Sequence, residues 1–427
     1  MRAVLFAAAG ILSSASLLAQ PADWRARLAD AIHAATTKNP ELARMDAEIG
    51  AAQERVRQAD ALPDPEVSVG AMNVPVDTFS FTADDMTMKT VGVSQSLPPA
   101  GARGAAREAA TAAAASIERE HMHHVVEIAA KTAQAFFDLA ALDGKLAIAR
   151  ETRALLDDDA RAAEERYRVG KGAQADVLRA SLEKTRVLRE IAEMEGDRRA
   201  AQAAFNALLA RPADTEEPPI ELSPDETPPG GQALLSRALA ESPVLRHYDA
   251  EIERAEAEAK RARLERRPMW NLSATYGQRE RRDDMVSAMV GISVPWIHPV
   301  RLAARAAEAD AMVSAAKAER ADAEYRLRGG IEAALAKLSS DLGQAGLYRE
   351  TILPQAEMNE RAAHEAYAVG SIDFATLVAA STDYRGFRSE YIDRLAAIGR
   401  DRADLQMAAG LPLLPGTPGM EHEHEKQ

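Results

Sequence analysis

Apolar residues recur every three or four positions through most of the chain, a spacing that places them on one face of a helix. Between Trp24 and Ala61 they follow a pattern typical of a coiled-coil seam, at Leu42, Met45, Ile49, Ala52, Val56 and Ala59. Similar spacing predicts further helices over about 98–168, 172–210, 232–267, 300–367 and 371–410. The helix that follows Pro98–Gly101 is the first long one; its length of about 64 residues would extend roughly 95 Å. Gly329-Gly330 and Pro354 are expected to bend its second-half counterpart.

Four short segments show a different pattern, in which apolar residues alternate with small polar ones. They are predicted strands at about 65–73, 88–97, 269–278 and 286–295. Strands of about ten residues with one apolar face match the lipid-facing strands of outer-membrane barrels. Four of them cannot close a barrel, and open edges are not tolerated in hydrocarbon, so several chains would have to combine their strands. The alternative is a small soluble sheet packed on the helices, which would need larger inward side chains than Ser, Gly and Thr.

The two halves of the chain carry similar sequences about 200 residues apart. Tyr167-Arg168-Val169-Gly170 recurs as Tyr367-Ala368-Val369-Gly370, and Ala180-Ser181 recurs as Ala380-Ser381. A repeat of this length is a duplicated domain rather than a solenoid unit. The predicted organisation is a signal peptide (1–19), a first repeat (20–210), a linker rich in proline and acid (211–231), a second repeat (232–412) and a disordered His/Glu tail (413–427).

The N-terminal residues have the features of a secretory signal peptide. Arg2 precedes an uncharged apolar run from Ala3 to Leu18, and a cleavage site is expected after Ala19. No other stretch approaches the roughly 18 apolar residues of a transmembrane helix. We therefore expect an exported protein without a helical membrane span.

Composition narrows the classes of function further. Aromatic residues make up only 4% of the chain and alanine dominates its apolar share, which favours thin helices packed in bundles. The net charge of -14 argues against nucleic-acid binding, which needs a basic surface. The absence of cysteine excludes disulfides, thiolate metal sites and a lipid anchor on an N-terminal cysteine. There is no phosphate loop, nucleophile elbow or His-Glu-x-x-His motif, so the sequence indicates neither an enzyme nor a cofactor.

The order of these features resembles the TolC-type outer-membrane efflux proteins, or outer-membrane factors, over essentially the whole mature chain. The matching features are the duplication, the strand–loop–strand insert in each half and the two Tyr-x-Val-Gly turns. The segments Gly92–Pro98 and Ile352–Ala356 also fit. The resemblance implies a homotrimer in outer-membrane lipid of a Gram-negative bacterium, with three times four strands in one twelve-stranded transmembrane β-barrel. Long antiparallel helical hairpins would form an α-barrel across the periplasm, which docks with an adaptor protein and an inner-membrane pump of the RND type.

The resemblance also implies a gate at the periplasmic end of this tunnel. In the family, an Asp six positions after the first-half glycine bonds the Tyr of the second-half turn, and Asp176 and Tyr367 occupy those positions. An Arg and two acidic residues of the best-studied member are replaced here by Ile372, Thr376 and Ala379. Asp373 is a candidate for a displaced acidic ring that would favour cations. Its alternative role is that of an ordinary acidic residue in the first turn of a helix, beside Ser371 as the cap.

An adaptor-docking tip is expected where each long helix turns into its return partner. Gly170 and Gly370 suit the left-handed position that follows a helix end. The side chains expected at the tip are apolar or aromatic, namely Tyr167, Val169, Tyr367 and Val369. The alternative is that these residues only pack the turn.

Within the family, the resemblance is closest to the heavy-metal branch, on the segments Leu62–Glu66, Met86–Lys89 and Pro98–Arg103. Histidines supply weak metal candidates, because imidazole suits copper, zinc and nickel. These candidates are His121 and His124, which share one face of a predicted helix, and His422 and His424 of the tail. The alternatives for them are interhelical packing and solvation.

Other functions stay open on sequence alone. The same duct would serve drugs, other small organic molecules or an exported protein, because the pump selects the cargo. A soluble periplasmic coiled-coil scaffold and a metal-sequestering protein that uses the histidines are further alternatives.

Overall fold

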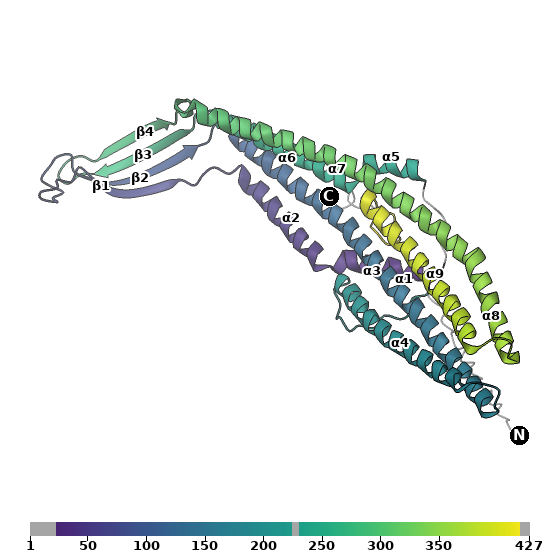
Figure 1. Cartoon of the computed structure of the whole chain (residues 1–427). Coiled ribbons are helices and arrows are strands. Elements are labelled where there is room, and N and C mark those ends of the chain that lie inside the picture. Colours follow the sequence, from purple (N-terminus) through teal and green to yellow (C-terminus); the bar gives the residue numbers. More distant parts are fainter. Residues whose placement is uncertain (1–22, 224–229, 419–427) are drawn as a thin grey trace, which may run out of the picture.

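The computed structural model of the chain describes residues 23–223 and 230–418. Helices run side by side along most of the molecule, and the strands form one sheet at a single end (Figure 1). The expected signal peptide and the tail histidines His422 and His424 lie outside the described residues. Within the described ranges, no helix is both long and apolar enough to span a bilayer. The predicted fold class, mainly α with a small β part, is confirmed.

The helices of the first half are α1 (Trp24–Lys38), α2 (Pro40–Ala59), α3 (Ala102–Arg168) and α4 (Gln174–Leu208). Those of the second half are α5 (Gly231–Glu241), α6 (Pro243–Leu264), α7 (Pro299–Leu347), α8 (Leu353–Val369) and α9 (Phe374–Ala409). Near the sheet, α3 packs against α2 and α6, and α6 packs against α7. Toward the other end, α3 packs against α4 and α9, and α9 packs against α8. The 67 residues of α3 extend about 100 Å, so this helix joins the two ends of the molecule.

The helix before the first strand of each half, predicted to be continuous, is broken by a proline. Asn39 adopts an extended conformation before Pro40, and its side chain accepts a hydrogen bond from the N–H of Glu41 at 2.9 Å. Proline lacks an N–H and disfavours helical geometry in the residue before it, so α1 ends and α2 begins here. Ser242-Pro243 separates α5 from α6 in the same way. The break is therefore part of the duplicated plan.

The long helix of the second half is interrupted by a π-helical turn at Tyr348–Ile352. Before it, α7 stays α-helical through Gly329 and Gly330, which were expected to bend it. The π-helical turn lies beside Pro354, whose missing N–H leaves the carbonyl four residues earlier without its usual partner. Figure 1 shows the ribbon curving between α7 and α8.

The strands form one antiparallel sheet that joins the two halves. They are β1 (Glu66–Met72), β2 (Met88–Leu97), β3 (Trp270–Gln278) and β4 (Met285–Ile292), in the order β1-β2-β3-β4. The central pair, β2 and β3, combines one strand from each half. Among the described residues, neither β1 nor β4 has a neighbour on its outer side. Val69 of β1 is 80% exposed and Val286 of β4 is 77% exposed, so both edges are unpaired and apolar.

In each half, an ion pair with a buried aspartate links the long helix to its return helix. Arg198 of α4 donates a hydrogen bond to Asp143 of α3 at 2.5 Å, and Arg394 of α9 donates one to Asp341 of α7 at 2.7 Å. Both aspartates are buried. A buried carboxylate is costly unless it is paired and hydrogen-bonded. Each pair therefore fixes how a long helix lies against its return partner.

The segment between the repeats, expected to be a surface linker over 211–231, is packed on the first half up to Ile220. Arg27 of α1 pairs with Glu217 at 2.8 Å. Ile220 is buried, and its N–H donates to Asp143 at 3.0 Å. Asp143 therefore binds both the linker and α4. Residues 224–229 lie outside the described chain.

One glycine of α9 is required by the close approach of α3. A Cβ on Gly399 would overlap the ring of Phe137, whereas a Cβ on Gly386 of the same helix would meet no atom. We predict that Gly399→Ala destabilises the protein by about 1–3 kcal/mol, because the core has no room for the methyl group. Gly386→Ala should stabilise it by about 0.5–1 kcal/mol through helix propensity alone. Denaturant midpoints of the two variants provide the test, and equal midpoints would contradict the packing.

Candidate functional site

The helical end opposite the sheet is formed by two tight turns, one between α3 and α4 and one between α8 and α9 (Figure 1). Gly170 and Gly370 both have positive φ, at 70° and 81°. The N–H of Lys171 donates to the carbonyl of Arg166 at 2.8 Å, and that of Ser371 donates to Ala366 at 2.9 Å. These bonds close the ends of α3 and α8 as Schellman motifs, which need a residue tolerant of the left-handed region. Only the glycine conformation was predicted from the sequence.

The two repeats place their tyrosines differently at this tip. Tyr167 is 47% exposed, but Tyr367 is only 6% exposed and packs on Phe374 with ring centroids 5.5 Å apart. Of the two roles considered for Tyr367, this burial favours packing of the turn over an exposed docking contact. The residue that corresponds to Phe374 in the first repeat is Gln174, so Tyr167 has no equivalent aromatic partner.

A small apolar cluster surrounds Tyr367 and connects all four helix ends. Its buried members are Ala180 of α4, Ala363 and Tyr367 of α8, and Phe374, Leu377 and Ala380 of α9, and Ala160 of α3 packs against them. Val169 and Val369, in contrast, project from the turns and are exposed, Val369 by 82%. The tip thus has a packed interior and apolar residues on its outer surface.

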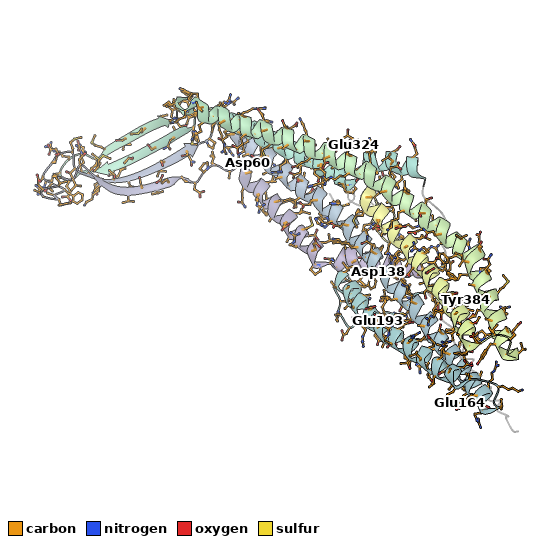
Figure 2. The ribbon with its side chains drawn as sticks, viewed as in Figure 1. Asp60, Asp138, Glu164, Glu193, Glu324 and Tyr384 are labelled. Carbon is orange, nitrogen blue, oxygen red and sulfur yellow. The ribbon has the colours of Figure 1, made fainter. Side chains whose placement is uncertain are left out.

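Arg166 joins the two turns, a contact that the sequence analysis did not anticipate. Its guanidinium lies over the ring of Tyr367, 4.5 Å from the centroid, and donates a hydrogen bond to the carbonyl oxygen of Tyr367. The equivalent position in the second repeat is Ala366, so the contact runs only from the first hairpin to the second. The difference between Arg166 and Ala366 beside the two tyrosines is visible in the sequence, but it does not identify the partner of Arg166. Figure 2 labels Glu164, two residues before Arg166, at this end of the molecule.

The expected hydrogen bond between Asp176 and Tyr367 is not formed in this structure. The Tyr367 hydroxyl is buried and has no hydrogen-bond partner among the described residues. Burial raises the pKa of Tyr367, and the nearby charges of Asp176 and Asp159 act in the same direction while Arg166 opposes them. Asp176 is therefore close enough to influence the hydroxyl, although Arg166 holds the ring.

Asp373 caps the first turn of α9. Its side chain accepts hydrogen bonds from the N–H of Thr376 at 2.9 Å and from the Thr376 hydroxyl at 2.7 Å. Ser371, expected to be the cap, instead donates to the carbonyl of Ala366 at the end of α8. The bonds from Thr376 lower the pKa of Asp373. Thr376, which stands where the family's best-studied member has an acidic residue, is thus the donor that holds Asp373.

A cavity of about 500 Å³ lies between α3, α8 and α9, beyond the tip cluster. Its lining includes Asp159, His364, Ser381 and Tyr384, and Tyr384 is labelled in Figure 2. Burial raises the pKa of Asp159, whose carboxylate lies 3.7 Å from Nδ1 of His364. The Ser381 hydroxyl is buried without a hydrogen-bond partner among the described residues. The cavity beneath the tip is therefore lined by polar groups, one of which, the buried Ser381 hydroxyl, lacks a hydrogen bond to any described residue.

Two histidines of α3 face carboxylates of α2. Nε2 of His121 lies 3.3 Å from Asp46, and Nδ1 of His124 lies 3.6 Å from Glu41. His121 and His124 do share one helix face, as predicted, and both meet carboxylates of α2. Burial lowers the pKa of the neighbouring His123. In the described parts of the chain, no group of three or more potential ligands is placed to hold a metal ion.

A sequence model of the family described as outer membrane efflux protein matches this chain twice, over residues 31–211 and 234–411. The second match begins close to 200 residues after the first, as expected for a duplicated domain. No curated protein sequence matches the chain significantly.

Solved structures of outer-membrane channels have the same fold. The outer-membrane channel OprN is 17% identical with a TM-score of 0.76, and the match covers 96% of this chain and 98% of OprN. The outer membrane protein VceC of Vibrio cholerae is 20% identical with a TM-score of 0.74, covering 90% of this chain and 96% of VceC. CusC, whose structures concern transmembrane channel formation, is 17% identical with a TM-score of 0.73, covering 92% and 95%. At these identities the likeness establishes a shared fold.

The capping role of Asp373 can be separated from its charge. We predict that Asp373→Ala speeds amide hydrogen exchange in the first turn of α9, because the N–H of Thr376 loses its acceptor. Asp373→Ser should keep the exchange slow, since its hydroxyl can accept the same bond. A carboxylate with a lowered pKa stabilises the fold above its ordinary pKa and loses this effect as the pH falls through the lowered value. Acid should therefore remove the difference between wild type and Asp373→Ala, and equal exchange at neutral pH would rule out the cap.

Proposed function

The chain belongs to the outer membrane efflux protein family, and we propose that it is the outer-membrane exit duct of a tripartite efflux pump. Membership makes it a transport channel rather than an enzyme. The observation that carries the proposal is the open four-stranded sheet at one end of a long helical wall. A sheet with two unpaired edges is not tolerated in hydrocarbon, so its edges must be completed by other chains.

We propose a homotrimer, in which β1 of one chain pairs with β4 of the next and twelve strands close the barrel. The exposed apolar side chains of both edge strands support this arrangement. The helical wall has matching apolar residues on its outer helices. Those on α4 include Leu178 and Leu182, and those on α7 and α8 include Met312, Tyr325 and Met358. Burial of these residues between neighbouring chains would close the helices into a tunnel below the barrel.

The opposite end would dock with a periplasmic adaptor and, through it, an inner-membrane pump of the RND type. The exposed Tyr167, Val169 and Val369 supply apolar contacts on turns that are themselves well fixed by hydrogen bonds. Such a rigid apolar tip suits a helical hairpin of the adaptor. The buried Tyr367 would contribute by holding the turn rather than by touching the adaptor.

Closure of the tunnel is assigned to the contacts among the hairpin tips. Arg166 binds the second hairpin through the ring and carbonyl oxygen of Tyr367, and opening would require this contact to separate. Asp176 provides an alternative acceptor for the Tyr367 hydroxyl once the ring moves. Asp373, repeated three times around the axis, would place negative charge at the entrance and favour cations.

Heavy-metal cations are the proposed cargo. The acidic chain is compatible with cations, and a conduit has no need of a tight binding site, because strong binding slows transit. Drugs and other small organic molecules are the alternative cargo.

Gate strength can be tested at Arg166. We predict that Arg166→Gln raises single-channel conductance in planar bilayers, because it removes a cation–π contact and a charged hydrogen bond worth about 2 kcal/mol together. Arg168→Gln is the matched control, since Arg168 is exposed and, within residues 23–223 and 230–418, pairs only with Glu165 on its own helix. An Arg166→Gln channel with wild-type conductance would show that the contact does not hold the tunnel closed.

The cargo can be tested by growth of a deletion strain on copper, silver, zinc, cadmium and cobalt salts, with dyes and antibiotics in parallel. We expect sensitivity to one or two metals, restored by the wild-type gene. Sensitivity to drugs with normal metal tolerance would keep the duct and overturn the metal cargo. Normal growth of the deletion strain in all conditions, although the wild-type strain produces the protein, would contradict an exit duct for these cargo classes.

A further inference from the structure

We propose that the junction between the sheet and the helices is a collar that binds anionic phospholipid headgroups. The collar consists of the segments 98–107, 260–267 and 296–305, which connect β2 to α3, α6 to β3 and β4 to α7. The inference rests on the proposed function, because it places the sheet in a bilayer. It adds to that function a preference for one class of lipid at the periplasmic boundary.

Charge is distributed very unevenly along the chain at this junction. The three collar segments contain nine Lys and Arg residues and one acidic residue, Glu265, in a chain whose net charge is -14. The neighbouring segment 60–66 adds three acidic residues. Three more, Glu108, Glu258 and Asp310, pair with collar side chains from just outside these segments, which leaves an excess of two basic side chains in each chain. Three copies would give a basic ring. A positively charged ring attracts anionic headgroups, and its sign is opposite to the net charge of the chain.

The collar segments lie together in space. Arg267 donates a hydrogen bond to the carbonyl of Ala100 at 2.6 Å, and Arg305 pairs with Glu265 at 2.9 Å. The first contact joins the start of α3 to the end of α6, and the second joins α6 to α7. The three segments therefore lie at one level, where the strands leave the helices (Figure 1).

Exposed apolar side chains lie at the same level. Trp296 and Ile297 belong to a short 3-10 turn at Pro295–Ile297, and Val300 opens α7 with 80% exposure. Trp270 at the start of β3 is also exposed. Tryptophan is enriched at membrane–water interfaces because its ring is apolar and its N–H is polar. Apolar anchors beside cationic groups are the pattern of a surface that enters the headgroup region of a bilayer.

Two collar arginines are available to a ligand. Most of the others are occupied by protein acceptors, such as Arg263 by Asp310 at 2.5 Å. The exposed side chains of Arg266 and Arg301, in contrast, form no hydrogen bond or ion pair with any residue that the structure describes. Guanidinium groups bind phosphate through paired N–H donors. Arg266 and Arg301 therefore carry the proposed preference for phosphatidylglycerol-like headgroups over zwitterionic ones.

The test uses the purified full-length assembly carrying Trp270→Phe, in vesicles that contain nitroxide-labelled lipid. Trp24 is buried in the helical core, so the label reports chiefly on Trp296. We expect labelled phosphatidylglycerol to quench Trp296 at lower lipid fractions than equally labelled phosphatidylcholine, by on the order of fivefold for each free arginine. In the Arg266→Gln/Arg301→Gln variant, the ratio of the phosphatidylcholine fraction to the phosphatidylglycerol fraction that gives equal quenching should fall toward one, while insertion is retained.

Arg199→Gln provides the matched control, because Arg199 is an exposed arginine of α4, outside the collar segments. It should keep the wild-type lipid preference. Equal quenching by both lipids in an inserted assembly would overturn the collar but leave the exit duct intact. An unchanged preference in the Arg266→Gln/Arg301→Gln variant would remove the assignment to these two side chains. Failure to insert into either kind of vesicle would contradict the exit duct itself.

Discussion

The unpaired backbone at the two outer edges of the sheet is the constraint on which the rest of the molecule depends. β1 and β4 each present N–H and C=O groups and apolar side chains that one chain leaves uncovered. In lipid such edges must be paired, and additional copies of the same chain offer complementary edges. A barrel assembled from several chains requires the helices below it to follow the same symmetry. In the proposed assembly, the helical tunnel and the basic collar follow from how the sheet is completed.

Duplication builds the scaffold, and the differences between the repeats build its specialised parts. The two Schellman turns occupy equivalent positions in the two halves, and the Asp143–Arg198 and Asp341–Arg394 pairs each link a long helix to its return helix. At the tip the symmetry is lost, because Arg166 corresponds to Ala366 and Phe374 corresponds to Gln174. The result is one exposed tyrosine, Tyr167, and one buried tyrosine, Tyr367, and only the buried one is contacted by an arginine of the other hairpin.

Periodic features could be predicted from the sequence, whereas contacts between distant segments could not. Residues 66–72 and 285–292 were identified as strands because apolar and polar residues alternate there, as they do when successive side chains point to opposite faces of a sheet. The breaks at Pro40 and Pro243 were missed because the apolar period continues across them. Arg166 was missed because stacking on Tyr367 depends on how two hairpins approach, which no local pattern encodes. Asp373 was correctly placed at the start of a helix, but the cap was assigned to Ser371 because both residues suit that position.

The most direct measurement of the central claim is disulfide cross-linking between the edge strands in native membranes. The chain has no cysteine, so a cysteine at Val69 of β1 can be combined with one at each position of 286–290 in β4. Within one sheet β1 and β4 are three strand spacings apart, roughly 14 Å, which is too far for a disulfide. A barrel shared by three chains should give a covalent trimer for the pairs in register and none for either single cysteine. Monomer alone throughout the series would contradict the pooled barrel.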